Sequence, residues 1–103
     1  MSTHTPSQID ERFRQLVDTW EAAVAHYSFS AARQRHPAYQ EIIALGEPVI
    51  PSLLRDLEVN RRYWFAALPA ITGANPVSPE HAGQIDRMIE DWLGWGTQRG
   101  YQW

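Results

Sequence analysis

Histidine and serine are the first side chains to consider for chemistry in this chain of 103 residues. None of the four histidines stands at the H-x-x-x-H spacing with which two histidines bind one metal ion on a helix. They are His4, His26, His36 and His81. Ser28 and Ser30 lack the G-x-S-x-G context of a nucleophile elbow. We therefore predict no catalytic residue and no metal site, and we interpret His36, directly before Pro37, as a residue that begins a helix.

Carboxylates could supply an acid–base pair if the fold held two of them, or one and a histidine, side by side. The candidates fall on the polar faces of the expected helices, where solvated surface is the simpler interpretation. They are Asp56, Glu58, Asp86, Glu90 and Asp91. A small enzyme of unknown class stays an alternative, without a set of residues to support it.

The chain contains no cysteine and no lysine, and all nine of its basic residues are arginine. The absence of cysteine excludes disulfides, thiolate zinc sites and a cysteine nucleophile. The absence of lysine excludes Schiff-base chemistry and a P-loop lysine. The net charge of −3 argues against nucleic-acid binding by overall charge and leaves open a local Arg patch. We predict no cofactor.

The adjacent Arg61 and Arg62 are candidates for binding a partner. Their simpler role is to pair with Asp56 or Glu58 across a turn, which would leave them structural. The alternative is a nucleic-acid-binding regulator that uses these two residues together with Arg33 and Arg35. The acidic total makes nucleic acid the weaker alternative.

Aromatic residues are abundant, with five Trp and four Tyr. A small helical domain needs most of them in its core. Trp95, Tyr101 and Trp103 differ, because they follow glycines near the end of the chain. They either fold back onto the core or form a patch that binds a partner protein, since Trp, Tyr and Arg dominate binding hot spots.

Turn signals and apolar periodicity predict an all-α fold, a compact five-helix domain spanning 1–103. The first five residues are expected to be disordered, and 97–103 to form a tail. The expected helices cover residues 5–27, 37–45, 48–59, 61–72 and 79–93. A polar connector over 28–35 has room for one helical turn.

The helix expected over 61–72 is apolar almost all round, which places it at the centre of the domain. Pro69 is expected to kink it. Trp64, Leu68 and Leu54 are predicted to form the central core. The last helix is expected to take Ser78 as its cap and to loosen after residue 93.

Residues 45–73 carry a pattern that resembles one HEAT-like repeat of the phycobilisome-lyase type. The first part reads LGEPVIPSLLRDL and the second RRYWFAALPAITG. Residues 36–101 also resemble a group of short bacterial proteins, through HPAYQ, WFxAL, ITG and WLxWG. The resemblance implies a single HEAT-like helical hairpin, enclosed by the first and last helices, and brings no activity with it.

These observations favour a non-enzymatic helical protein-interaction domain, such as an adaptor, an inhibitor or an antitoxin-like partner of another bacterial protein. The expected partner-binding residues are Arg61, Arg62, Trp95, Tyr101 and Trp103. No apolar run approaches the roughly 20 residues of a membrane span, and the start lacks the features of a signal peptide. We therefore expect a cytoplasmic protein. The partner's identity and the oligomeric state stay open.

Overall fold

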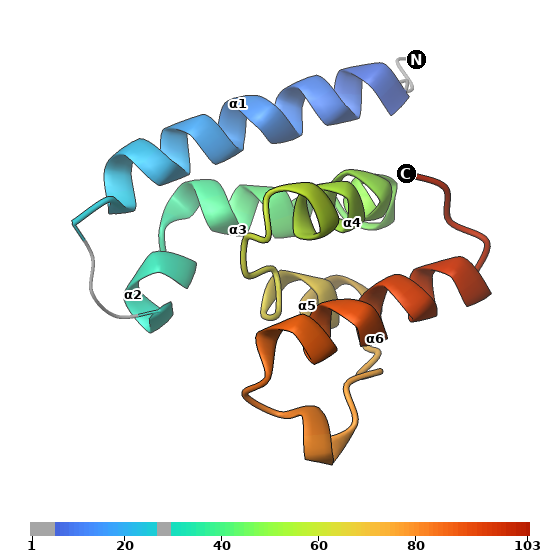
Figure 1. Ribbon diagram of the computed structural model, residues 1–103. Coiled ribbons are helices and arrows are strands. Elements are labelled where there is room, and N and C mark those ends of the chain that lie inside the picture. The colour runs from blue at the N-terminus through green and yellow to red at the C-terminus, as the bar shows by residue number, and fades with distance from the viewer. Residues whose placement is uncertain (1–5, 27–29) are drawn as a thin grey trace. The chain divides into compact units, whose positions relative to one another are not determined.

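The computed structural model describes residues 6–26 and 30–103, and all regular structure in these residues is helical (Figure 1). The all-α class is thus confirmed for the described part. It holds six α-helices and two short 3₁₀-helices, where five helices were predicted. The chain divides into two compact units, one up to Val49 and one from Ile50 to Trp103. The single-domain assignment stays a prediction.

The first unit is built on α1 (Pro6–Val24), which packs against α3 (Pro37–Ala44). One stripe of α1 is buried, as the three- and four-residue spacing predicted. It consists of Ile9, Phe13, Leu16, Val17, Trp20 and Val24. The predicted ends of this helix, Thr5 and Tyr27, lie outside the described residues, as does the predicted disordered start.

Both ends of α3 follow their sequence signals. His36 is its N-cap, and its Nδ1 accepts a hydrogen bond from the Ala38 amide at 3.1 Å. Gly46 has a φ of 73°, a left-handed conformation that suits glycine after a helix end. The short α2 (Ser30–Gln34) is the single turn for which the connector had room.

The second unit contains α4 (Ile50–Val59), α5 (Ala67–Thr72), η2 (Pro79–His81) and α6 (Ile85–Gln98). Helix α4 packs against α6. The apolar stripe predicted for α4 is fully buried, and consists of Ile50, Leu53, Leu54 and Leu57. Pro48, expected to open this helix, lies instead in the preceding η1 (Glu47–Val49).

Helix α5 is shorter than predicted, because it begins at Ala67 and not at Arg61. The chain before it is irregular, and Arg61 has a φ of 56°, which a right-handed helix cannot contain. Pro69 consequently falls in the first turn of α5, where its missing N–H breaks no helical bond and no kink is required. Trp64 and Leu68 are fully buried as predicted, whereas Tyr63 is 57% exposed.

Helix α6 differs from the prediction at both ends. Pro79 opens η2, so Ser78 does not cap α6, which begins at Ile85. The helix then continues through Gly94 and Gly96 to Gln98, leaving a tail of only 99–103. Packing overrides the low helix propensity of glycine here. The predicted hairpin corresponds to α4 and α5, and its HEAT-like character stays a prediction.

Candidate functional site

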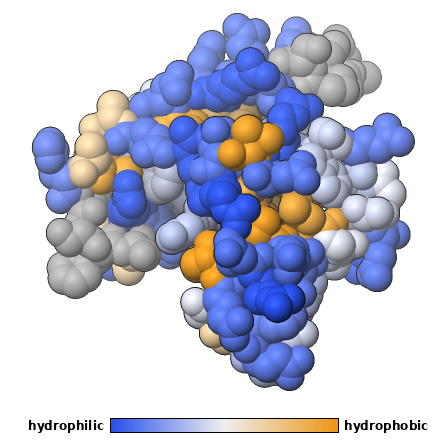
Figure 2. All heavy atoms as spheres, in the orientation of Figure 1, coloured by the Kyte–Doolittle hydropathy of each residue, from blue (hydrophilic) through white to orange (hydrophobic). Residues whose placement is uncertain are grey.

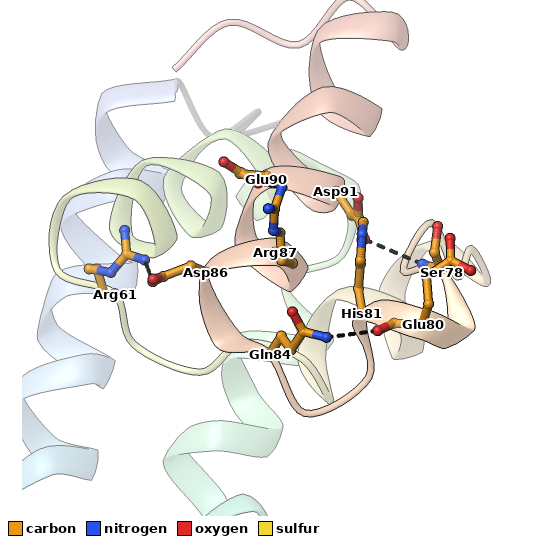
Figure 3. A network of polar contacts seen from close by, with 9 residues as sticks. All are labelled: Arg61, Ser78, Glu80, His81, Gln84, Asp86, Arg87, Glu90 and Asp91. Atoms are coloured by element: carbon orange, nitrogen blue, oxygen red, sulfur yellow. Dashed lines mark hydrogen bonds and ion pairs between the residues drawn. The ribbon is translucent and has the colours of Figure 1, made fainter.

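The predicted basic pair lies in the irregular connection between α4 and α5. Arg62 Nη1 donates to Asp56 Oδ1 at 2.6 Å, which confirms one of the two proposed partners, Asp56 and Glu58. Arg61 pairs instead with Asp86, in the first turn of α6 (Figure 3). Both cations thus meet a carboxylate within the second unit.

The carboxylate of Asp56 organises this connection. Asp56 is 7% exposed, which corrects its assignment to a polar face. Besides Arg62, Asn60 Nδ2 and Trp64 Nε1 donate to its two oxygens, each at 2.7 Å. The amides of Asn60 and Arg61 donate to its carbonyl. A buried charge is stable only when hydrogen bonds satisfy it, and these bonds hold the connection in one conformation.

The three predicted aromatic residues, Trp95, Tyr101 and Trp103, lie around the end of α6, each partly exposed. Gly100 has a φ of 82° and turns the chain back, so that the Tyr101 amide donates to the Gly96 carbonyl at 3.0 Å. The Tyr101 ring stacks on Trp95 with centroids 5.7 Å apart. The structure thus brings Trp95 and Tyr101 into ring contact.

Trp103 occupies a notch beside the buried Gly96. A Cβ on Gly96 would stand 2.6 Å from Leu54 Cδ1 and 3.0 Å from Trp103 Cζ3. Trp103 Nε1 also donates to Glu58 Oε1 at 3.0 Å. The tail therefore packs onto α4 and α6, which agrees with the prediction that it folds back onto the core. Part of each ring is still exposed.

Arg99 joins these rings and was missed by the sequence analysis. Its guanidinium lies 5.3 Å from the centre of the Trp95 ring, within the range of a cation–π contact. Among the described residues no carboxylate lies within ion-pair distance of Arg99. The i,i+4 spacing from Trp95 would have indicated this contact, had the helix been extended past residue 93. We call Trp95, Arg99, Tyr101 and Trp103 the C-terminal aromatic face.

The predicted Arg pair does not belong to this face. Arg61 contacts the first turn of α6 through Asp86, and Trp95 follows nine residues later. At 1.5 Å per residue the two positions are about 14 Å apart along the helix. Arg62 points back to α4 and serves the connection.

A second polar arrangement joins η2 to α6 (Figure 3). His81 Nδ1 lies 2.7 Å from Asp91 Oδ2, which also accepts a hydrogen bond from the Ser78 amide at 3.3 Å. The His81 hydrogen bond lowers the pKa of Asp91 below its ordinary value of 3.8. The Ser78 amide and the charges of His81 and Arg87 lower it further, against a rise caused by burial.

The pairing of His81 with Asp91 overturns the assignment of Asp91 to a solvated face. Nothing in the ten-residue separation signals it, because the contact depends on how η2 returns to α6. A histidine beside an ionised carboxylate has the form of a general base. Neither residue lines the neighbouring groove, however, and Asp91 is already engaged by the Ser78 amide. We assign this pair a structural role.

A shallow groove of about 280 Å³ lies between the 75–83 segment and the helices α5 and α6. Its lining is largely apolar. The lining residues are Phe65, Pro69, Asn75, Val77, Ser78, Pro79, Ala82, Gly83, Met88 and Trp92. Hydrophilic residues cover most of the face in Figure 2, and hydrophobic residues surface on it only in small groups.

Within residues 6–26 and 30–103, no group of three or more His or acidic side chains could hold a metal ion. In the same part of the chain, no helix has both the length and the apolar character that a membrane crossing requires.

Comparison with protein-family models, with curated proteins and with solved structures gave no match. The proposed function therefore depends on the residues of the site.

Proposed function

We propose that the chain is a non-enzymatic helical protein-interaction domain that contacts its partner through the C-terminal aromatic face. The observation that carries the proposal is the arrangement around Trp95. Its ring contacts both Tyr101 and Arg99, and no carboxylate of the described chain pairs with that arginine. Trp, Tyr and Arg are the residues that dominate the energetics of protein interfaces.

The face is held in place before any partner arrives. The Tyr101 amide donates a hydrogen bond to the Gly96 carbonyl, and Trp103 packs against Gly96 and donates a hydrogen bond to Glu58. Side chains that are already ordered lose less conformational entropy on binding. A rigid, partly exposed aromatic surface is thus suited to recognition, while it contributes packing to the unit.

Arg61 and Arg62 have different parts in this proposal. Arg61 is 49% exposed and forms a polar rim about 14 Å from Trp95 along α6. Arg62 has an indirect part, because its ion pair with Asp56 holds the connection between α4 and α5 in place. A HEAT-like repeat over 45–73 stays a prediction within this proposal, and an adaptor, an inhibitor or an antitoxin-like protein are forms that this function can take.

The Arg-based alternative, a nucleic-acid-binding regulator, receives less support from the contacts. Arg61 and Arg62 each face a carboxylate, and the Arg33 guanidinium lies 5.7 Å from the centre of the Trp20 ring. Such pairing reduces the charge available to phosphates.

The test is photo-crosslinking in cells that naturally contain the protein. A photoreactive phenylalanine replaces the exposed Gln102, which lies between two residues of the face. The matched control carries it at the exposed Ala22 of α1. We expect a discrete protein adduct from position 102, absent from position 22 and lost when Arg99→Glu is added. Equal adducts from both positions, no adduct, or an adduct with nucleic acid would contradict the proposal.

A further inference from the structure

One face of α6 joins the groove to the C-terminal aromatic face. Met88, Trp92, Trp95 and Arg99 follow one another at steps of four, three and four residues, which places them on one side of a helix. Met88 and Trp92 line the groove. The rings of Trp92 and Trp95 meet edge to face with centroids 5.3 Å apart. Trp92 is only 1% exposed and belongs to the core beneath the surface. We call the other three residues, Met88, Trp95 and Arg99, the α6 stripe, and it spans about 16 Å.

Aromatic side chains outside α6 also contribute to the groove or lie next to it. Phe65 lines the groove, and the exposed Tyr63 stacks on it with centroids 5.9 Å apart. The volume of about 280 Å³ is below the range of drug-sized pockets. A space of this size and lining suits the apolar side chains of a protein segment.

The charges along the α6 stripe indicate what such a segment must carry. Beside its middle, Asp91 is paired with His81, and Arg87 lies 3.6 Å from Glu90. At its end Arg99 has no carboxylate partner among the described residues. Arg99 is therefore the charged group of the α6 stripe that has no oppositely charged partner among the described residues. The exposed Glu80, beside the groove residue Pro79, also has no ion pair in this part of the chain.

We propose that the groove and the α6 stripe bind one amphipathic helix of a partner protein. Its apolar side chains occupy the groove at Met88, and a carboxylate at one end pairs with Arg99. This deepens the proposed function and rests on it. A helix fits better than an extended peptide, because residues 6–26 and 30–103 contain no strand whose edge could pair with one. The partner is thus an apolar, acidic helical segment.

The test uses the full chain and a selection of phage-displayed random 16-residue peptides. A fluorescein-labelled copy of the most enriched peptide is then titrated with the protein and followed by fluorescence anisotropy. We expect an enriched pattern of apolar residues at three- and four-residue steps with Asp or Glu at one end. No enrichment, or a pattern with Lys or Arg at that end, would overturn the proposal.

Matched variants locate the peptide. Arg99→Glu should weaken binding about tenfold, which corresponds to 1.4 kcal/mol, and changing the acidic residue of the peptide to Lys should restore it. Arg35→Glu, an exposed arginine of the first unit, makes the same charge change and should have no effect. Equal affinity for Arg99→Glu and the unchanged protein would overturn the proposal.

Two different groove variants are tested, so that the result does not depend on one variant that fails to fold. Met88→Glu and Val77→Gln should each weaken binding at least fivefold, and Val59→Glu, on the exposed end of α4, should not. A melting curve identifies any variant that fails to fold. If both folded groove variants bind normally while the Gln102 adduct still depends on Arg99, the helix assignment is wrong and the proposed function stands.

Loss of both the adduct and the peptide signal would remove both proposals. Sedimentation equilibrium tests whether a second copy occupies the groove instead. A dimer that Met88→Glu dissociates would identify the occupant as this chain and overturn the assignment to a partner protein.

Discussion

Two carboxylates of the second unit hold irregular chain against a helix, and they do so in different ways. Asp56 has a side chain that is 8% exposed and receives bonds from Asn60, Arg62 and Trp64. Asp91 has a side chain that is 19% exposed and is held by His81 and one amide. Asp56 is thus a buried carboxylate with several hydrogen-bond donors around it. The His81–Asp91 pair is more exposed, and its contribution to stability depends on whether Asp91 is ionised.

A carboxylate that anchors irregular chain contributes more to stability when it is buried. An exposed pair exchanges its hydrogen bonds for bonds to water at little cost. A buried carboxylate leaves several donors unsatisfied when it is removed. The C-terminal tail supplies a third case, because Trp103 is held mainly by its fit against Gly96 and not by an ion pair.

The largest effect is expected for Asp56→Ala. It leaves Arg62 and the buried Trp64 Nε1 without their acceptor, so the free energy of unfolding should fall by about 3–5 kcal/mol. Urea unfolding followed by circular dichroism measures it. Asp18→Ala removes an exposed carboxylate and should stay within about 0.5 kcal/mol. If Asp56→Ala lowers the free energy of unfolding by less than about 1 kcal/mol, Asp56 contributes no more to stability than Asp91, and the proposed difference is wrong.

The loss of stability caused by Leu68→Ala can be compared with that caused by Asp56→Ala, because it measures apolar packing in the same region. Leu68 is fully buried in α5, and truncation of a buried leucine costs about 2–5 kcal/mol. The same urea titration serves, with the 67%-exposed Val59→Ala as the control. A change under about 0.5 kcal/mol would show that α5 is peripheral and that the Asp56 bonds hold the connection without it.

Gly96→Ala tests the tail, where shape replaces charge. The added Cβ meets Leu54 and Trp103, and overpacking of this kind costs about 1–3 kcal/mol. Gly94→Ala is the matched control, because no atom lies within 4 Å of its Cβ. That change should be neutral or stabilise the helix by about 0.5–1 kcal/mol. Equal melting temperatures for the two variants would contradict the close packing of Leu54 and Trp103 against Gly96.

The smallest effect is expected for Asp91→Asn, about 0.5 kcal/mol at pH 5. The pKa of Asp91 is lower in the folded chain than its ordinary value of 3.8. Its stabilisation is therefore complete well above pH 3.8 and is lost as the pH falls through the lowered pKa. Unfolding curves of both proteins between pH 5 and pH 2.5 should converge. A constant or growing difference would contradict the assigned cause.

Contacts that are local in sequence could be predicted. The spacing of apolar residues located the buried faces of α1 and α4, because helix periodicity alone determines them. The Arg62–Asp56 pair lies six residues apart, across a single turn, and was among the predicted pairings. His36 before Pro37 carried enough information to mark the start of α3.

Contacts between distant segments could not be predicted. Arg61 meets Asp86 across 25 residues, and Trp103 meets Glu58 across 45. Such pairs depend on the packing of α4 against α6, which no short pattern encodes. The same packing explains why α6 continues through Gly96, since the close approach of Leu54 requires a residue without a side chain there.

The start of α5 shows a different limit. Residues 61–66 are apolar enough to suggest a helix, and the competing interaction comes from Asp56 in the preceding helix. Its carboxylate draws the next side chains toward it, and the left-handed backbone at Arg61 prevents a helical start. Periodicity measures burial, and it does not show which hydrogen bonds compete for the backbone.

The ring cluster at the end of α6 also gives the molecule an optical signature. Trp92 and Trp95 meet at 73°, and Tyr101 stacks on Trp95 at 27°. Aromatic transitions held at such close, fixed and non-parallel angles produce near-ultraviolet circular dichroism, which disappears when packing loosens. Circular dichroism near 280 nm can thus report on the arrangement of these rings without any added label, in the same sample whose helical signal is read in the far ultraviolet.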